Sequence, residues 1–197
     1  YLLIIFSSIS VVSEEVNDPF EEINRKTYAF NEKLDEILVK PIAETYSKAP
    51  PKIKNGVTNF FNNLEEVDTF INQLLQGKPK KSLNDLTRFI INTTIGIGGF
   101  IDVASKMGLQ RHEEDFGQTL AVWGVGEGPY IMLPFLGPST LRDTFSRPVS
   151  SFLSVSFHMT ETDVNIALKS IDALETRERL LDVESLLSGD KYSFVKD

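Results

Sequence analysis

The sequence has no cysteine and only two histidines among its 197 residues. Without cysteine it contains no disulfide, no thiol nucleophile and no thiolate metal ligand. His112 lies in the acidic run His112-Glu113-Glu114-Asp115 and His158 in an unrelated apolar stretch, whereas a zinc site needs several ligands that converge. No serine lies in a GxSxG motif. We therefore predict no enzymatic activity, no metal site and no cofactor.

Basic residues are in the minority. The chain has 20 Lys and Arg against 28 Asp and Glu, a net charge of −8, so no dominant basic surface is available for nucleic acid. Much of the lysine is local, between residues 40 and 81. That region predicts a surface for anionic headgroups or an acidic partner, or else a solvated face.

Long hydrophobic runs are absent except at residues 1–13, YLLIIFSSISVVS. This run is of signal-peptide length and is too short to span a bilayer. It lacks an initiator methionine, so we interpret the sequence as part of a longer chain. We expect residues 1–16 to be a signal-peptide remnant or a retained anchor, residues 17–190 to be a helical domain and residues 191–197 to be a tail.

Beyond residue 17, apolar residues recur at the spacing of amphipathic helices. Such stripes occupy residues 18–38, 53–75, 83–91 and 160–181, and Gly77 is a predicted helix C-cap. No run favours a substantial sheet. The pattern predicts an all-α, multi-helix single domain with irregular Gly/Pro-rich apolar loops.

Several local expectations follow from single residues. Pro41 is expected to end or kink the first helix, and Pro148 to interrupt a later one. Residues 150–159 alternate serine with apolar residues, a pattern that fits either a strand or a small-residue helix. Glu65 and Glu66 lie at helix positions that normally face water.

The stretch from Phe116 to Arg142 combines apolar residues with glycine and proline. It holds the single tryptophan, and three prolines exclude a regular helix through its second half. Irregular apolar backbone needs a protected setting, because its N–H and C=O groups must find partners. The stretch predicts either a buried loop or the border of a site for an apolar ligand.

Three glycines, Gly96, Gly98 and Gly99, lie within four positions among isoleucines. No GK[ST] follows them, so a phosphate-binding loop is a poor match. Their backbone freedom predicts a hinge that gates the loop of residues 97–116. Close packing, where glycine only makes room, is the competing explanation.

Several dispersed motifs, in register over residues 18–187, resemble the MlaA/VacJ family. They are Asp18-Pro19-Phe20-Glu21-Glu22-Ile23-Asn24-Arg25, Asn62 to Glu66, Asn72 to Gly77, Thr87-Arg88-Phe89, Asn92 to Ala104, Trp123-Gly124-Val125-Gly126, Gly128-Pro129-Tyr130 and Leu141-Arg142-Asp143.

The resemblance implies a ring of helices in the inner leaflet of the Gram-negative outer membrane, with an amphipathic channel through its middle. It implies a non-enzymatic component of phospholipid trafficking, exported to the periplasmic side, that maintains lipid asymmetry. The expected partners are phospholipid, the inner leaflet, a trimeric porin and a periplasmic lipid-carrier protein. Because family members are commonly lipoproteins and this sequence has no cysteine, we expect attachment through interfacial helices, a retained N-terminal segment or a partner.

The resemblance also suggests site residues. We expect Trp123, Tyr130, Met132 and Phe135 to lie beside the lipid path. Arg142 or nearby lysines are expected to contact phosphate, and the competing reading is that Arg142 forms a structural pair with its neighbour Asp143. Two other functions stay open: a soluble periplasmic helical lipid-binding protein with a closed apolar pocket, and a hydrolase of lipid esters.

Overall fold

The computed structural model describes residues 16–154, 162–184 and 189–196. The predicted signal remnant, His158 and residues 155–159 of the undecided segment lie outside the described residues, apart from Val16. The described elements are α1 (Glu21–Leu34), η1 (Asp35–Val39), α2 (Lys40–Tyr46), α3 (Pro51–Leu75), α4 (Pro79–Thr94), α5 (Val103–Lys106), α6 (Phe116–Val122), β1 (Tyr130–Leu133), β2 (Gly137–Thr140), α7 (Leu141–Leu153), α9 (Thr162–Glu184) and α10 (Lys191–Lys196).

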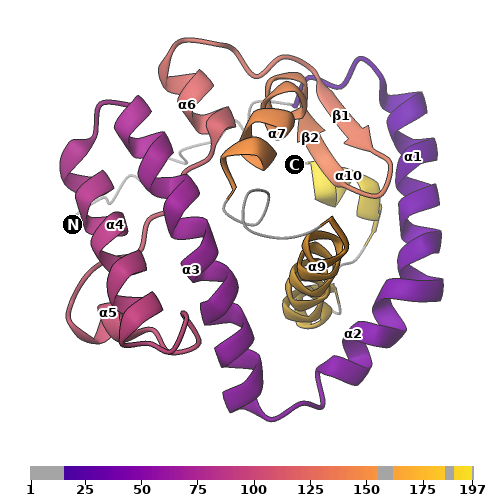
Figure 1. Cartoon of the computed structure of the whole chain (residues 1–197). Coiled ribbons are helices and arrows are strands. Elements are labelled where there is room, and N and C mark those ends of the chain that lie inside the picture. Colours follow the sequence, from indigo (N-terminus) through magenta and orange to yellow (C-terminus); the bar gives the residue numbers. More distant parts are fainter. Residues whose placement is uncertain (1–15, 155–161, 185–188, 197) are drawn as a thin grey trace, which may run out of the picture.

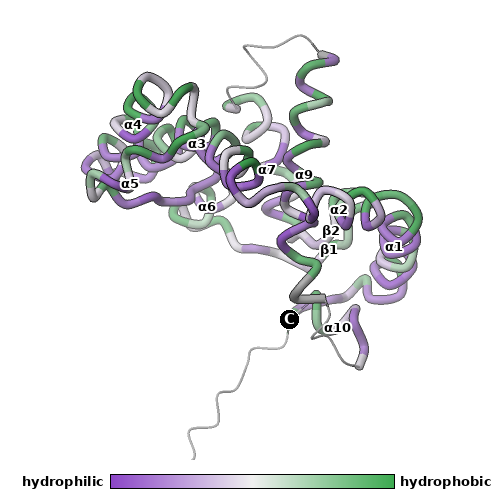
Figure 2. The backbone as a smooth tube through the Cα atoms, turned by 90° about the horizontal axis from the view of Figure 1, so that it is seen from below, coloured by the Kyte–Doolittle hydropathy of each residue, from purple (hydrophilic) through white to green (hydrophobic). Residues whose placement is uncertain are grey.

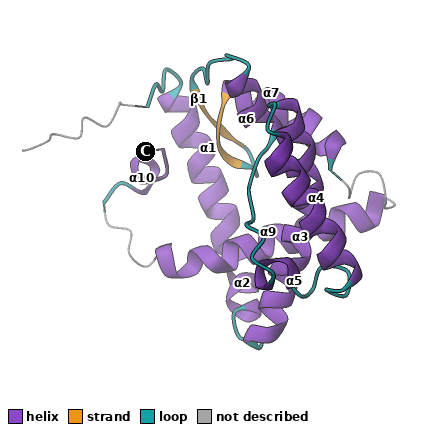
Figure 3. Cartoon of the chain, turned by 90° about the vertical axis from the view of Figure 1, so that its left-hand side faces the viewer, coloured by secondary structure: helices purple, strands orange, loops and turns teal. Residues whose placement is uncertain are grey.

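The helices are arranged as a ring. Helices α1 to α4, α6, α7 and the β1–β2 hairpin surround α9, which is seen nearly end-on in Figure 1. Seen from below in Figure 2, α1 to α7 form one layer, while α9 rises from one side of it and α10 lies on the other. Helices dominate and the antiparallel hairpin is small (Figure 3). The predicted all-α, ring-like domain is confirmed.

Proline and glycine set the ends of the α3–α4 helical hairpin. Pro51 and Pro79 occupy the first positions of α3 and α4, where the missing N–H costs no helical hydrogen bond. Gly77 has a φ of +73° and ends α3, with Lys78 N donating to Gln73 O at 2.9 Å. This is the predicted C-cap.

The two interior prolines behave differently. Pro41 follows the π-helical segment η1, and α1 and α2 meet there at an angle (Figure 1), in agreement with the predicted kink. Pro148 lies inside the continuous helix α7, so the predicted interruption is wrong. A proline removes one backbone hydrogen bond from a helix, here the one to Thr144, without obliging the helix to end.

The interior of the molecule is polar. Among the described residues the buried apolar side chains are few: Ala43, Phe61, Ala104, Tyr130, Met132 and Tyr192. The buried polar side chains outnumber them and include Asn24, Asn63, Glu66, Thr69, Asn72, Gln73, Asp85, Arg88, Asn92, Thr119 and Glu175. The predicted water-facing position of Glu66 is wrong, since that side chain is 1% exposed between α3 and α4.

The predicted tail, residues 191–197, is instead largely the helix α10 and belongs to the fold. Tyr192 is buried, and its ring meets the rings of Tyr28 and Tyr130 edge-on. The guanidinium of Arg25 lies over the same ring, 4.3 Å from its centroid. The buried ring, the Lys191–Glu32 ion pair and the hydrogen bond from the Tyr192 hydroxyl to Asp18 together hold this short helix against α1 and the hairpin.

Candidate functional site

Apolar side chains are exposed on α4 and at both ends of α3, while the middle of the α3 stripe is half-buried. Ile90 and Leu83 on α4 are 52% and 63% exposed, and Ile53 and Leu74 on α3 are similarly exposed. Green apolar and purple polar positions alternate along these helices in Figure 2. A water-soluble helix buries its apolar stripe. The buried side chains of α4 are all polar, and those of α3 are polar except Phe61. This distribution is typical of a protein whose outer surface contacts an apolar phase.

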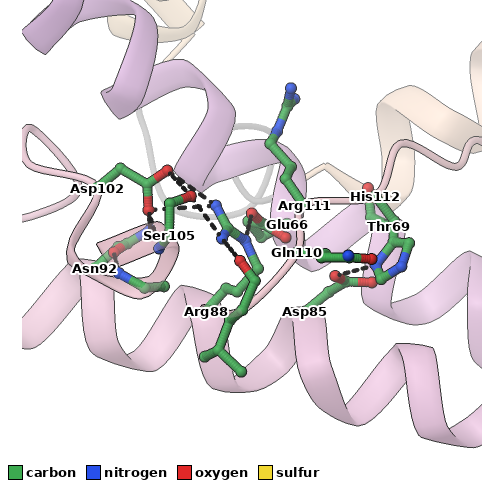
Figure 4. A network of polar contacts seen from close by, with 12 residues as sticks. Glu66, Thr69, Asp85, Arg88, Asn92, Asp102, Ser105, Gln110, Arg111 and His112 are labelled. Carbon is green, nitrogen blue, oxygen red and sulfur yellow. Dashed lines mark hydrogen bonds and ion pairs between the residues drawn. The ribbon is translucent and has the colours of Figure 1, made fainter. Parts of the chain in front are cut away.

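Arg88 is the centre of the polar interface between α3 and α4, and it is 1% exposed. Its Nε donates to Glu66 Oε1 at 2.6 Å, and its Nη1 donates to Leu109 O at 2.7 Å and to Ser105 Oγ at 3.1 Å. Its Nη2 lies 3.2 Å from Asp102 Oδ2 (Figure 4). One guanidinium therefore connects α3, α4, α5 and the loop after α5.

The pKa values of the two carboxylates in this cluster, Glu66 and Asp102, are shifted in opposite directions. Burial raises the pKa of Glu66, and the bond from Arg88 only partly offsets that effect. Burial alone would also raise the pKa of Asp102, but hydrogen bonds from Ser105 and Asn92, with the charge of Arg88, lower it to about 2. Arg88 thus neutralises two carboxylates that would otherwise be costly to bury.

Asn92 fixes the loop that contains the three glycines. Its Oδ1 accepts from the backbone N–H of Val103 and of Ala104, both at 2.9 Å, and its Nδ2 donates to Asp102 Oδ1 at 3.1 Å. The backbone N–H of Gly99 donates to Asn92 O at 2.9 Å. These bonds attach the turn and the start of α5 to the end of α4.

The three glycines are needed for different reasons. A Cβ at Gly96 would lie 2.1 Å from Ile101 O, and one at Gly99 would lie 2.6 Å from the Asn63 Cβ. A Cβ at Gly98 would meet nothing within 4 Å, although its φ is +67°. The contacts favour close packing for Gly96 and Gly99, and leave Gly98 as the position where only backbone conformation matters. A hinge here stays a prediction.

Alanine at Gly99 is expected to lower stability more than alanine at Gly98. The first change adds a clash with Asn63 to the strain of a positive φ, about 1–3 kcal/mol of overpacking, while the second adds strain of about 1–2 kcal/mol alone. Melting temperature and lipid transport are measured for both variants. If Gly98→Ala melts normally but transports slowly, the hinge gains support; equal melting temperatures for the two variants would contradict the packing assignment.

The predicted lipid-path residues fall into two groups. Tyr130 and Met132 are buried with Tyr192 in the apolar cluster beneath the hairpin, so their place beside a lipid path stays a prediction. Trp123 and Phe135 are 53% and 72% exposed. Tyr130 and Met132 are two residues apart on β1 and so point to the same, buried face of the hairpin, whereas Trp123 ends α6 and Phe135 lies in the turn between β1 and β2.

Two asparagines one heptad apart on α1 hold the hairpin. Met132 N donates to Asn24 Oδ1 at 2.9 Å, and Asn24 Nδ2 donates to Tyr130 O at 3.1 Å. Asn31 holds the hairpin tip in the same way, because Phe135 N donates to its Oδ1 at 2.8 Å and its Nδ2 donates to Leu133 O. Sequence reasoning missed these roles; two asparagines seven residues apart on one helix face were the signal.

Arg142 has carboxylate partners in place. Its Nε lies 2.9 Å from Asp143 Oδ1 and its Nη2 lies 3.7 Å from Glu127 Oε1. The side chain is largely buried. This geometry favours the structural pair over the phosphate contact.

No metal site is evident in the part of the chain that the structure describes, where His, Cys, Asp and Glu side chains form no group of three arranged to hold an ion. His112 is instead paired with the fully buried Asp85, with its Nδ1 2.8 Å from Asp85 Oδ1. This is a structural contact between the loop after α5 and α4.

Comparison with known proteins decides the family. The family model described as MlaA lipoprotein matches residues 16–197. The chain belongs to the MlaA family. The resemblance to MlaA/VacJ proteins is thereby confirmed, and the motifs from Asp18 to Asp143 are those of an MlaA domain.

Named relatives agree with the family assignment. The chain is 41% identical over 188 residues to the Intermembrane phospholipid transport system lipoprotein MlaA of Escherichia coli (strain K12), and 40% identical over 188 residues to that of Shigella flexneri. Each alignment covers 92% of this chain and 74% of the relative. A solved structure described as "Structural basis for maintenance of bacterial outer membrane lipid asymmetry" superposes with a TM-score of 0.78 at 33% identity, covering 91% of this chain and 99% of that one.

Proposed function

We propose that this MlaA-family chain is a non-enzymatic component of phospholipid transport at the Gram-negative outer membrane. It lies on the periplasmic side with its apolar faces in the inner leaflet and contributes to lipid asymmetry. The observation that carries the proposal is the inverted distribution of side chains, apolar outside and polar inside. The names of the relatives, a phospholipid transport lipoprotein and a structure concerned with outer membrane lipid asymmetry, support it.

Energetics favour a position within one leaflet. Each Å² of apolar surface moved out of water gains roughly 25 cal/mol, and α3 and α4 each offer an exposed apolar stripe. None of the described helices is both long and apolar enough to cross a bilayer. Helices with one polar and one apolar face bind at the interface instead. The polar cluster around Arg88 then stays inside protein, where its partners lie.

The finer steps follow from the family. Phospholipids from the outer leaflet would enter an amphipathic channel within the ring and pass to a periplasmic lipid carrier, in association with a trimeric porin. The exposed Trp123 and Phe135 are the proposed lipid contacts along this path. Tyr130 and Met132 anchor β1 in the core, and Phe135 lies in the turn that follows this strand.

Trp123 supplies the test, because it is the only tryptophan of the chain. Phospholipids brominated along the acyl chain quench a tryptophan that they touch. We expect strong quenching and a blue shift of Trp123 fluorescence when the protein binds vesicles that contain such lipids. When the protein is bound to vesicles of unbrominated lipid, we expect no quenching.

Failure of this test has a clear form. If the folded protein floats with the vesicles and Trp123 fluorescence stays unchanged, Trp123 does not touch lipid. If the protein stays soluble as a monomer and retains bound lipid, the chain is a soluble lipid-binding protein with a closed pocket and the proposed membrane position is wrong.

A further inference from the structure

Two adjoining cavities lie beside the middle of α3. The first, about 150 Å³, lies between α3 and α9 and has an apolar wall of Phe61, Leu64 and Leu168. The second, about 240 Å³, lies between α3 and the segment that leads into α6. Both are lined by Glu65 and Asp68, so these carboxylates form a shared wall with apolar surface on one side and polar space on the other.

Most charges around the cavities are already paired. Arg111 binds Glu65 at 2.7 Å and also pairs with Glu113, and Lys78 binds Glu114 at 2.8 Å. These pairs account for the basic side chains that approach the second cavity from α4 and from the loop before α6. On the α9 side, Glu175 and Glu178 are paired with Arg179 and Lys54, whereas Asp172 forms no ion pair with a described residue.

Of the charged side chains that line the first cavity, Asp68, Asp172 and Lys169 form no ion pair with a described residue, whereas Glu65 is paired with Arg111. Asp68 accepts only a hydrogen bond from Asn72 Nδ2, at 2.9 Å. Asp172 and Lys169 line the first cavity from α9, and neither forms an ion pair with a described residue. The first cavity therefore presents two free negative groups, one free positive group and an apolar wall.

The surroundings of Asp68 and Asp172 disfavour the charged form of both carboxylates when no ligand is bound. Burial, followed by the charge of Asp115, raises the pKa of Asp68 to about 6. Burial also raises the pKa of Asp172, with Glu175 adding to the effect and Arg179 opposing it. A charged carboxylate held in a partly buried cavity without a cation lowers stability, which is typical of a site built for a ligand.

We propose that this cavity is a headgroup subsite for zwitterionic phospholipids that carry a primary ammonium group, an inference that rests on the proposed function. Asp68 and Asp172 accept hydrogen bonds from the ammonium, Lys169 binds the phosphate, and the glycerol end of the lipid lies against Phe61 and Leu168. An ammonium has three N–H donors, which two carboxylates can share. A glycerol headgroup has no positive charge, so its negative phosphate would lie near the same carboxylates with no ammonium to offset the repulsion.

The subsite predicts a preference for phosphatidylethanolamine over phosphatidylglycerol. The full chain is incubated with vesicles containing equal amounts of the two lipids and purified in mild detergent, and the bound lipid is quantified by mass spectrometry. We expect phosphatidylethanolamine to be enriched about tenfold over its share in the vesicles, the scale of one charge-assisted hydrogen bond. Asp68→Asn with Asp172→Asn should bring the enrichment close to one.

Controls separate the charge of the site from the fold. Asp163→Asn, an exposed carboxylate on the same helix α9, should leave the enrichment unchanged. Lys169→Met should reduce the retained amount of both lipids, because both carry the phosphate. Since burial disfavours the charged form of Asp68 and Asp172, the asparagine variants should melt no lower than the parent chain.

Three outcomes would overturn either the headgroup subsite or the proposed function on which it rests. Equal retention of the two lipids by the parent chain overturns the headgroup subsite and leaves the proposed function standing. Enrichment that survives Asp68→Asn with Asp172→Asn overturns its assignment to this cavity. Retention of neither lipid by the folded parent chain overturns the proposed function itself.

Discussion

Replacing Arg88 by alanine is expected to destabilise the protein by about 3–5 kcal/mol, the cost of leaving buried charges without their partner. Glu66 loses its ion pair with Arg88, while Asp102 and the Leu109 carbonyl lose donors. Equilibrium unfolding of the detergent-solubilised variant measures the loss. A loss below about 1 kcal/mol would mean that the cluster does not hold α3, α4 and α5 together.

Matched variants make this result specific. Lys26→Ala removes the ion pair with Glu22, in which both side chains are exposed, and it should cost at most about 1 kcal/mol. The double variant Arg88→Met with Glu66→Leu removes the two buried charges together and should be more stable than Arg88→Ala. A double variant as unstable as the single one would contradict the unpaired-charge explanation.

Aspartate at both Leu83 and Ile90 is expected to reduce membrane binding by at least a hundredfold. A charged residue inside hydrocarbon costs about 2.5–3.5 kcal/mol, and both side chains lie on the outward face of α4. Flotation of the purified protein with vesicles and fractionation of cells that express it measure the bound fraction. Unfolding measurements should show little loss of stability, because neither side chain is buried.

The control keeps these two positions apolar. Leu83→Met with Ile90→Leu changes shape but not polarity and should bind membranes like the parent chain. If the aspartate variant also stays with the outer membrane fraction, another surface or a partner holds the protein there and the face of α4 does not meet hydrocarbon.

Sequence reasoning located the helices well, because their signals are local. The apolar period of α3 and α4 and the glycine at position 77 depend on neighbouring residues only. The kink at Pro41 is equally local. Pro148 was placed wrongly because the helix α7 continues through it, an outcome that depends on packing around the proline rather than on the proline itself.

The direction in which a helix face points is not a local property. Periodicity identifies an apolar stripe and a polar stripe on α3, and assigning the apolar stripe to the core assumes that the surroundings are water. Glu66 was therefore expected to face solvent, although it lies between α3 and α4. Apolar lipid surroundings reverse the assignment, and only the three-dimensional arrangement reveals that reversal.

The candidate site was predicted in part. The stretch from Phe116 to Arg142 does contain exposed apolar residues, Trp123 and Phe135, within irregular backbone. Strand alternation within the hairpin then sends Tyr130 and Met132 inward, a pattern that the prolines obscured. The headgroup cavity combines Asp68 of α3 with Lys169 of α9, which are too far apart in sequence for any spacing to connect them.

The proposed position in the membrane is tested most directly by measuring how deep the apolar face of α4 lies in a reconstituted bilayer. The sequence contains no cysteine, so a nitroxide attached at Ile90→Cys is a unique label, and a second label at the exposed Lys26→Cys serves as the reference. We expect dissolved oxygen to speed relaxation of the label at position 90 and a water-soluble nickel chelate to leave it unaffected, with the opposite result at position 26. Equal access of the nickel chelate to both labels would place the face of α4 in water and contradict the proposed position in the membrane.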